Sequence, residues 1–126
     1  MNNPNDLQYT DSHEWVRLEE EMATIGITAH AADNLSDLVF LELPEVGTEV
    51  TAGEAFGEIE SVKAVADLKS PVNGTIVETN EGLADALELV NNAPYEDGWM
   101  IKVQLSGTPN TLLDAASYDA LVASET

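Results

Sequence analysis

Residues 57–68 read GEIESVKAVADL, and the lysine at the centre of this run is Lys63. Strand-like segments at 54–61 and 64–69 predict a tight hairpin with its tip near residues 62–64. The tip lacks the Asn-Gly or Asp-Gly pair that marks the commonest two-residue turns. A lysine at such a tip is presented to other proteins, so this run indicates both a β-rich fold and a site of contact.

Basic side chains are scarce along the whole chain. Arg17, Lys63, Lys69 and Lys102 stand against 24 acidic residues, and the formal net charge is −20. A nearly lone lysine between small and apolar neighbours is poorly explained by a salt bridge and well explained by covalent modification. The negative charge argues against nucleic acids and anionic membranes as partners. It suits solubility, and it also suits partners with basic docking surfaces.

The chain has no cysteine, so any thiol chemistry must come from an attached group. His13 and His30 lack the spacing of paired metal ligands, and no metal site is predicted. Since no nucleophile–base pair is visible either, we expect no catalytic residues and no enzyme activity. The chain shows neither a signal peptide nor an apolar run of membrane-spanning length. We therefore expect a cytoplasmic protein, or a mitochondrial one only if a transit peptide was removed.

The remaining pattern predicts one β-rich domain over residues 1–126. Thr28 is a predicted N-cap for a helix over 29–35, and a second short helix is predicted over 83–90. Apolar residues at helical spacing predict a C-terminal amphipathic helix over about 109–123. Short strands separated by glycine and proline favour a β-sandwich or a flattened barrel. The other predicted strands lie at 7–20, 23–27, 37–43, 75–79 and 99–105.

Five segments carry a pattern that extends along most of the chain. They are YTDSHEWV at 9–16, ATIGIT at 23–28, VFLELP at 39–44, ESVKA at 60–64 and NAPYEDGW at 92–99. Read together, they resemble the H-protein family of the glycine cleavage system. The resemblance runs from about Leu7 to Leu105 with fitting spacings, and the C-terminal helix fits too. One departure is Ser36, which stands where glycine is common.

The resemblance implies a flattened barrel-sandwich fold of the lipoyl-domain type, with short helices and a C-terminal helix. It also implies that lipoic acid is joined by an amide bond to Lys63. The lysine stem and lipoyl chain give about ten bonds of roughly 1.5 Å, a reach on the order of 10–15 Å. The dithiolane would supply the redox sulfurs that the chain itself lacks.

The resemblance further implies a set of partner enzymes. A pyridoxal-phosphate-dependent glycine decarboxylase would load an aminomethyl group onto the arm. A tetrahydrofolate-dependent aminomethyltransferase would take the one-carbon unit, and dihydrolipoyl dehydrogenase would reoxidise the dithiol. A lipoate-attaching enzyme would modify the lysine beforehand. Ser12, Glu14 and Asp67 match positions associated with holding the loaded amine, which suits a cation among carboxylates and a hydroxyl.

Two alternatives remain at this point. Another lipoyl or biotinyl carrier would share the hairpin, but Val62 and Ala64 differ from the methionines beside a biotinyl lysine, and Val62 differs from the aspartate typical of lipoyl domains of 2-oxo acid dehydrogenases. An acidic interaction protein would leave Lys63 unmodified. Glu60 and Ser61 are open to two interpretations, either structural residues of the hairpin or residues recognised by the lipoate-attaching enzyme.

Overall fold

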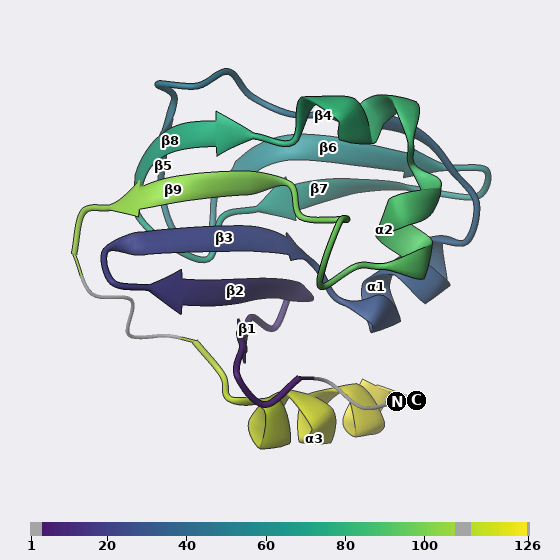
Figure 1. The fold of residues 1–126 in the computed structure, drawn as a ribbon. Coiled ribbons are helices and arrows are strands. Elements are labelled where there is room, and N and C mark those ends of the chain that lie inside the picture. Colours follow the sequence, from purple (N-terminus) through teal and green to yellow (C-terminus); the bar gives the residue numbers. More distant parts are fainter. Residues whose placement is uncertain (1–3, 108–111, 126) are drawn as a thin grey trace.

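Two antiparallel sheets form the body of the protein in a computed structural model that describes residues 4–107 and 112–125 (Figure 1). The larger sheet has the strand order β1-β2-β3-β9-β8-β5, and the smaller has the order β4-β6-β7. The strands are β1 (Gln8–Tyr9), β2 (Glu14–Glu19), β3 (Met22–Ile27), β4 (Leu38–Glu42), β5 (Glu49–Val50), β6 (Ala55–Ser61), β7 (Val65–Lys69), β8 (Gly74–Thr79) and β9 (Ile101–Leu105). The sheets are not closed into a barrel, so the predicted β-rich sandwich is confirmed in its open form.

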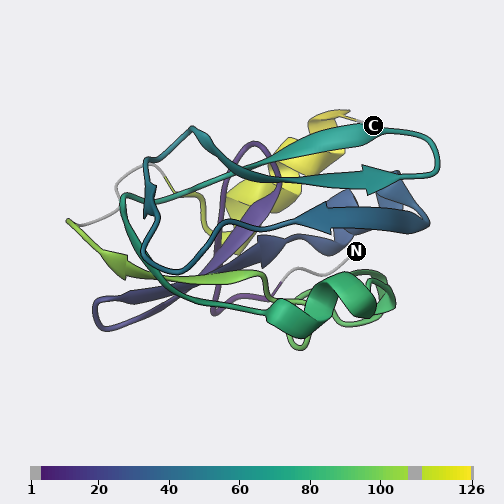
Figure 2. The ribbon, with the colours of Figure 1, turned by 90° about the horizontal axis from the view of Figure 1, so that it is seen from above.

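The main core lies between the two sheets. Because side chains alternate across a strand, each strand sends every second residue inward. Ile25 and Ile76 from the larger sheet and Ile59 and Leu68 from the smaller one are almost fully buried in the same cluster. This packing fixes the β6–β7 hairpin against the larger sheet, while its turn projects at the edge of the molecule (Figure 2).

The helices are α1 (Ala29–Leu35), the 3-10 helix η1 (Glu81–Asp85), α2 (Glu88–Asn92) and α3 (Ala115–Glu125). α1 and α2 contact one another at one end of the sandwich, and α3 lies beside β1. Thr28 is the N-cap of α1 and accepts a hydrogen bond from the backbone N–H of Ala31, as predicted. Ser36 ends this helix with φ of 63°, which explains why glycine suits the position. None of the helices described is long and apolar enough to cross a membrane.

Two helix predictions need correction. The single helix expected over 83–90 is divided into η1 and α2, with a break at 86–87. The C-terminal helix begins at Ala115 rather than near 109, although residues 109–111 lie outside the described part of the chain. Leu113, expected in that helix, is extended because its backbone pairs with Tyr9.

A second, smaller core joins α3 to the larger sheet. It contains Leu7, Tyr9, Trp15, Ala115 and Tyr118, all nearly or fully buried. In Figure 1, α3 lies below β1 and away from α1 and α2. The N-terminal strand and C-terminal helix therefore stabilise one another at one end of the fold.

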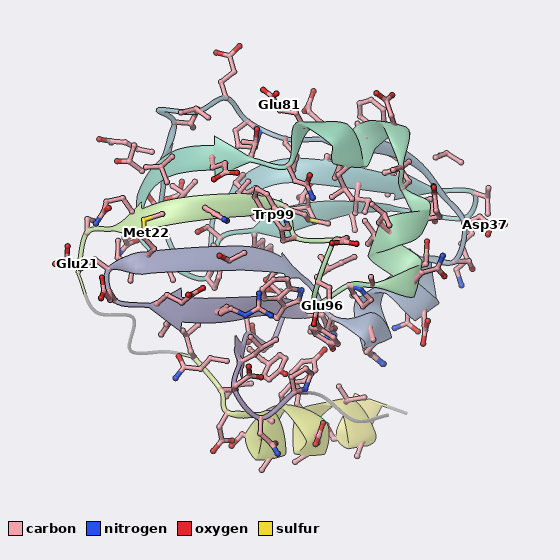
Figure 3. All side chains as sticks on the ribbon, viewed as in Figure 1. Glu21, Met22, Asp37, Glu81, Glu96 and Trp99 are labelled. Atoms are coloured by element: carbon pink, nitrogen blue, oxygen red, sulfur yellow. The ribbon has the colours of Figure 1, made fainter. Side chains whose placement is uncertain are left out.

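Acidic side chains are spread over the whole surface. Figure 3 shows Glu21, Asp37, Glu81 and Glu96 on different sides of the molecule. The negative charge is therefore not gathered at a single site.

Candidate functional site

Lys63 is exposed in the turn between β6 and β7, where the sequence predicted it. The Ser61 hydroxyl holds this turn: it accepts hydrogen bonds from the backbone N–H groups of Lys63 (3.3 Å) and Ala64 (3.0 Å). The backbone N–H of Val62 also donates to the carbonyl of Asp37 (3.0 Å), which ties the turn to the start of β4. The tip is consequently fixed at its backbone, while the lysine side chain extends into solvent.

The outer face of the smaller sheet carries acidic residues beside this tip. Strand register places Glu58 between Glu42 on β4 and Asp67 on β7. Partial desolvation, followed by the charges of Glu60, Asp67 and Glu42, raises the pKa of Glu58 above its ordinary value. Asp67 is thus an exposed member of an acidic row on the outer face.

A tight turn at Thr10–Glu14 forms the second part of the site, and the sequence did not predict it. The expected strand over 7–20 is interrupted, because the N–H of Thr10 bonds to the carbonyl of Glu14 (3.0 Å) and that of His13 to the carbonyl of Thr10 (3.2 Å). His13 adopts φ of 71°, a left-handed conformation uncommon outside glycine. The Asp11-Ser12 pair was the local signal available, since both residue types favour turns.

The Glu14 carboxylate is buried within this turn, with 2% of its surface exposed. Its Oε1 accepts hydrogen bonds from the hydroxyls of Thr10 (2.7 Å) and Ser12 (2.5 Å), and its Oε2 accepts one from the backbone N–H of Lys69 (3.4 Å). Burial raises the pKa of Glu14, while these hydrogen bonds and the Lys69 charge oppose the shift. The result is a buried acid whose hydrogen-bond donors here are neutral hydroxyls and an amide.

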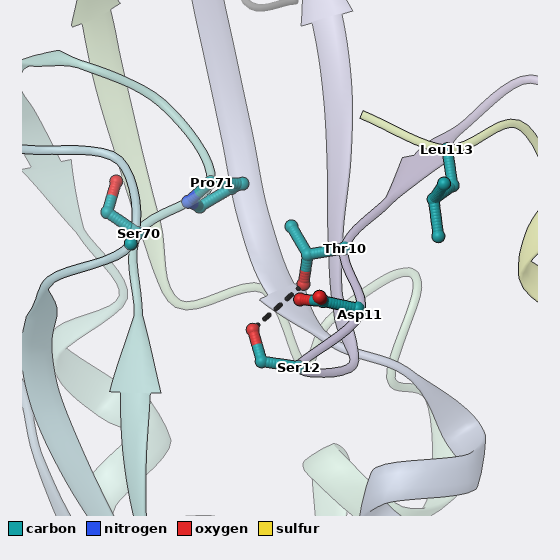
Figure 4. Close-up of a pocket in the computed structure, with 7 residues that line it drawn as sticks. Thr10, Asp11, Ser12, Ser70, Pro71 and Leu113 are labelled. Carbon is teal, nitrogen blue, oxygen red and sulfur yellow. Dashed lines mark hydrogen bonds between the residues drawn. The ribbon is translucent and has the colours of Figure 1, made fainter. Parts of the chain in front are cut away.

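A cavity of about 200 Å³ opens beside this turn. Figure 4 shows Thr10, Asp11 and Ser12 on one side, Ser70 and Pro71 on the opposite side, and Leu113 at the margin. The liquid volume of one water is about 30 Å³, so the space would hold several waters or a small organic group. The cavity therefore lies between the Thr10–Glu14 turn and the segment that follows β7.

The structure brings some of the predicted site residues together and separates others. Ser12 and Glu14 are in direct contact, and their role in binding an arm remains a prediction. Asp67 lies two residues before Lys69 on β7 and pairs with Glu58 on the outer face, so its role remains a prediction. Lys63 lies in the turn that precedes β7, and the Lys69 amide that donates to Glu14 lies at the far end of this strand.

Comparisons with known proteins agree over nearly the whole chain. A family model described as glycine cleavage H-protein matches residues 7–125. The chain is 53% identical over 125 residues to the glycine cleavage system H protein of Nitratidesulfovibrio vulgaris, covering 99% of this chain and 98% of the relative. It is 54% identical over 121 residues to that of Synechococcus elongatus, covering 94% of each. A crystal structure of a glycine cleavage system H protein from Mycobacterium marinum superimposes with a TM-score of 0.91 at 39% identity, covering 96% and 99%.

Proposed function

The chain belongs to the glycine cleavage H-protein family, the lipoyl-bearing shuttles of the glycine cleavage system, and we propose that Lys63 is its lipoyl attachment site. The exposed lysine on a backbone-fixed turn carries this proposal, because an acylating enzyme needs a reachable amine in a defined position. The fold is accordingly the lipoyl-domain sandwich that the sequence predicted. H proteins are carriers, which fits the expectation that this chain has no catalytic residues of its own.

The length of β7 fits an arm that starts at Lys63. Lys69 lies six positions after Lys63, so the path along the strand is at most about 20 Å. Three backbone bonds advance a chain by about 3.6 Å, or about 1.2 Å per bond. A lipoyllysine arm with a one-carbon amine on its sulfur has about 16 bonds from Cα to nitrogen, hence a reach of about 19 Å. The end of such an arm, rather than its middle, would arrive beside Glu14.

Glu14 and Ser12 are the residues that would hold an amine at the end of the arm. When bound, the lipoyl group supplies the sulfur that carries the cargo. Burial raises the pKa of Glu14, so the carboxylate gains from any cation that enters its surroundings. Ser12 adds a hydroxyl on the cavity wall, and Asp67 adds negative charge along the outer face of β7. Together they would attract and bind an ammonium.

The partners follow from the family. We propose that a pyridoxal-phosphate-dependent glycine decarboxylase, an aminomethyltransferase and dihydrolipoyl dehydrogenase each meet the Lys63 tip in turn, after a lipoate-attaching enzyme has modified it. The tip stands clear of the sandwich, which allows successive partners to approach the same lysine (Figure 2). The acidic row of Glu42, Glu58 and Asp67 next to it suits partners with basic contact surfaces.

Intact-mass measurement after production in lipoate-replete cells tests the attachment site. We expect one added lipoyl group, its loss in Lys63→Arg, and its retention in Lys69→Arg. Lys69 is the matched control because it is an exposed lysine in the same hairpin. Lipoyl mass on Lys63→Arg, a biotinyl mass, or a wholly unmodified wild type would each overturn the proposal.

The role of Glu14 is tested by the rate at which the loaded protein releases its amine into water. A charge-assisted hydrogen bond contributes about 1.5–3 kcal/mol, and 1.4 kcal/mol corresponds to tenfold. Glu14→Gln should therefore accelerate release at least about tenfold, whereas Glu49→Gln, at an exposed position on β5, should leave it unchanged. Both variants should be lipoylated like the wild type. Equal release rates for the two variants would show that Glu14 does not hold the cargo.

A further inference from the structure

His13 adopts a costly backbone conformation beside the two residues proposed to hold the cargo. Its φ of 71° is one of the positive values at non-glycine residues in the described chain. Such a conformation costs about 1–3 kcal/mol and persists only when surrounding contacts impose it. Since His13 stands between Ser12 and Glu14 in the sequence, whatever holds His13 also sets the positions of these two side chains.

Two contacts hold His13 from different elements. Its carbonyl accepts a hydrogen bond from the N–H of Thr28 at the start of α1 (3.0 Å). Its Nδ1 lies 2.7 Å from the hydroxyl of Tyr118, which lies 105 positions away on α3. That hydroxyl is also 2.7 Å from Oγ1 of Thr28. Because Oγ1 of Thr28 already accepts from the N–H of Ala31, its proton can go to Tyr118, which can donate to His13.

Tyr118 is itself held rigidly. It is fully buried, and its ring stacks on Tyr9 with a centroid distance of 4.7 Å and an angle of 13°. Tyr9 and Leu113 exchange two backbone hydrogen bonds of 2.8 and 2.7 Å, which tie the segment before α3 to β1. The phenol therefore reaches His13 from a fixed support, as a positioning group should.

We propose that Tyr118 is a positioning residue for the cargo-binding turn: its hydroxyl holds His13 in the left-handed conformation that places Ser12 on the cavity wall and Glu14 in contact with Ser12. The effect of Tyr118 on cargo binding rests on the proposed function, whereas its effect on the conformation of the turn does not. Loss of the hydroxyl leaves the ring stack in place and removes the hydrogen bond from Tyr118 to the His13 ring. The C-terminal helix thus acts on the cavity through one hydroxyl.

Amide hydrogen exchange in the unmodified protein tests this directly. The N–H groups of His13 and Glu14 bond within the turn, to the carbonyl and the hydroxyl of Thr10. In Tyr118→Phe we expect both amides to exchange about tenfold faster. Tyr9→Phe is the matched control, because it removes the other hydroxyl of the same ring stack, which donates to the carbonyl of Pro4. Equal protection of the turn in the two variants would overturn the proposal.

A glycine variant separates positioning from general stability. Glycine adopts positive φ at little cost, so His13→Gly should keep the turn without help from Tyr118. Adding Tyr118→Phe to His13→Gly should then change neither amide, and a further loss of protection would contradict the proposal. In the lipoylated protein, Tyr118→Phe should release the cargo amine faster than Tyr9→Phe. If Glu14→Gln leaves release unchanged, the cargo role fails, while the exchange result still decides the role of Tyr118.

Discussion

Replacing Ser61 by alanine distinguishes the two interpretations of the residue that precedes the carrier hairpin tip. The Ser61 hydroxyl accepts from the N–H groups of Lys63 (3.3 Å) and Ala64 (3.0 Å) and donates to the carbonyl of Ala64 (3.2 Å). Each such bond contributes about 0.5–1.5 kcal/mol net, and these distances place the three at the weaker end. We therefore expect Ser61→Ala to lower the free energy of unfolding by about 1–2 kcal/mol.

Thermal unfolding converts this into a measurable shift. An unfolding entropy of about 2.1 cal/mol/K per residue gives about 0.26 kcal/mol/K for a chain of 126 residues. Ser61→Ala should therefore lower Tm by about 4–8 °C, while Ser61→Thr, which keeps the hydroxyl, should stay close to the wild type. At temperatures below Tm, a purified ligase should lipoylate Lys63 of Ser61→Ala at a rate within about threefold of the wild-type rate. We expect this because the turn would be loosened but would stay accessible.

The opposite pattern would refute this reasoning. If Ser61→Ala leaves Tm unchanged and is lipoylated much more slowly, while Ser61→Thr is lipoylated like the wild type, then the ligase recognises the hydroxyl and the hydroxyl does not hold the turn. The structure favours the first outcome because Ser61 has only 9% of its surface exposed, which leaves little for an enzyme to contact.

Two further predictions concern the sheet and the buried acid. A methyl group on Gly57 would overlap the backbone carbonyl oxygen of Glu42. Gly57→Ala should therefore separate β4 from β6 and lower the free energy of unfolding by about 2 kcal/mol or more. Gly82→Ala, where the space around the added methyl group is open, should be neutral or stabilising in the same denaturation assay. Burial raises the pKa of Glu14 above its ordinary value of 4.5, so between these two pKa values the folded protein binds a proton that the unfolded chain does not. The free energy of unfolding should therefore fall as pH rises through that window. Denaturant titrations from pH 4 to 8 should show this pH dependence in the wild type and not in Glu14→Gln. If Glu14→Gln keeps the same pH dependence, other titrating groups cause it.

The hairpin half of the site could be predicted from the sequence because its determinants are local. Strand-like runs on both sides of the tip, an isolated lysine and a hydroxyl residue before it all lie within a few positions. The helix cap at Thr28 is local in the same sense, and the structure confirms it. Such features depend on short-range hydrogen bonds that the chain makes wherever the rest of the fold lies.

The cargo half could not be predicted in the same way. Trp15 and Val16 extend an apparent strand through the Thr10–Glu14 turn, and the left-handed conformation of His13 has no glycine to mark it. The contact that holds His13 comes from Tyr118, 105 positions away, so no local pattern contains it. Leu113 was expected in the C-terminal helix for a related reason. It has helical spacing from the apolar residues that follow, but in the structure its backbone pairs with Tyr9 instead. Tertiary contacts override local preference at both positions.

In the proposed function, β7 sets the interval between the lipoylated lysine and the turn that would hold the cargo. One end of this strand continues into the turn that holds Lys63, and the other donates its Lys69 N–H to Glu14. Inserting two residues would move the cavity about 7 Å farther from the lysine, while inserting one would send Asp67 to the inner face. Because an arm on Lys63 would have one chemical length, the proposed function requires this strand to keep its residue count.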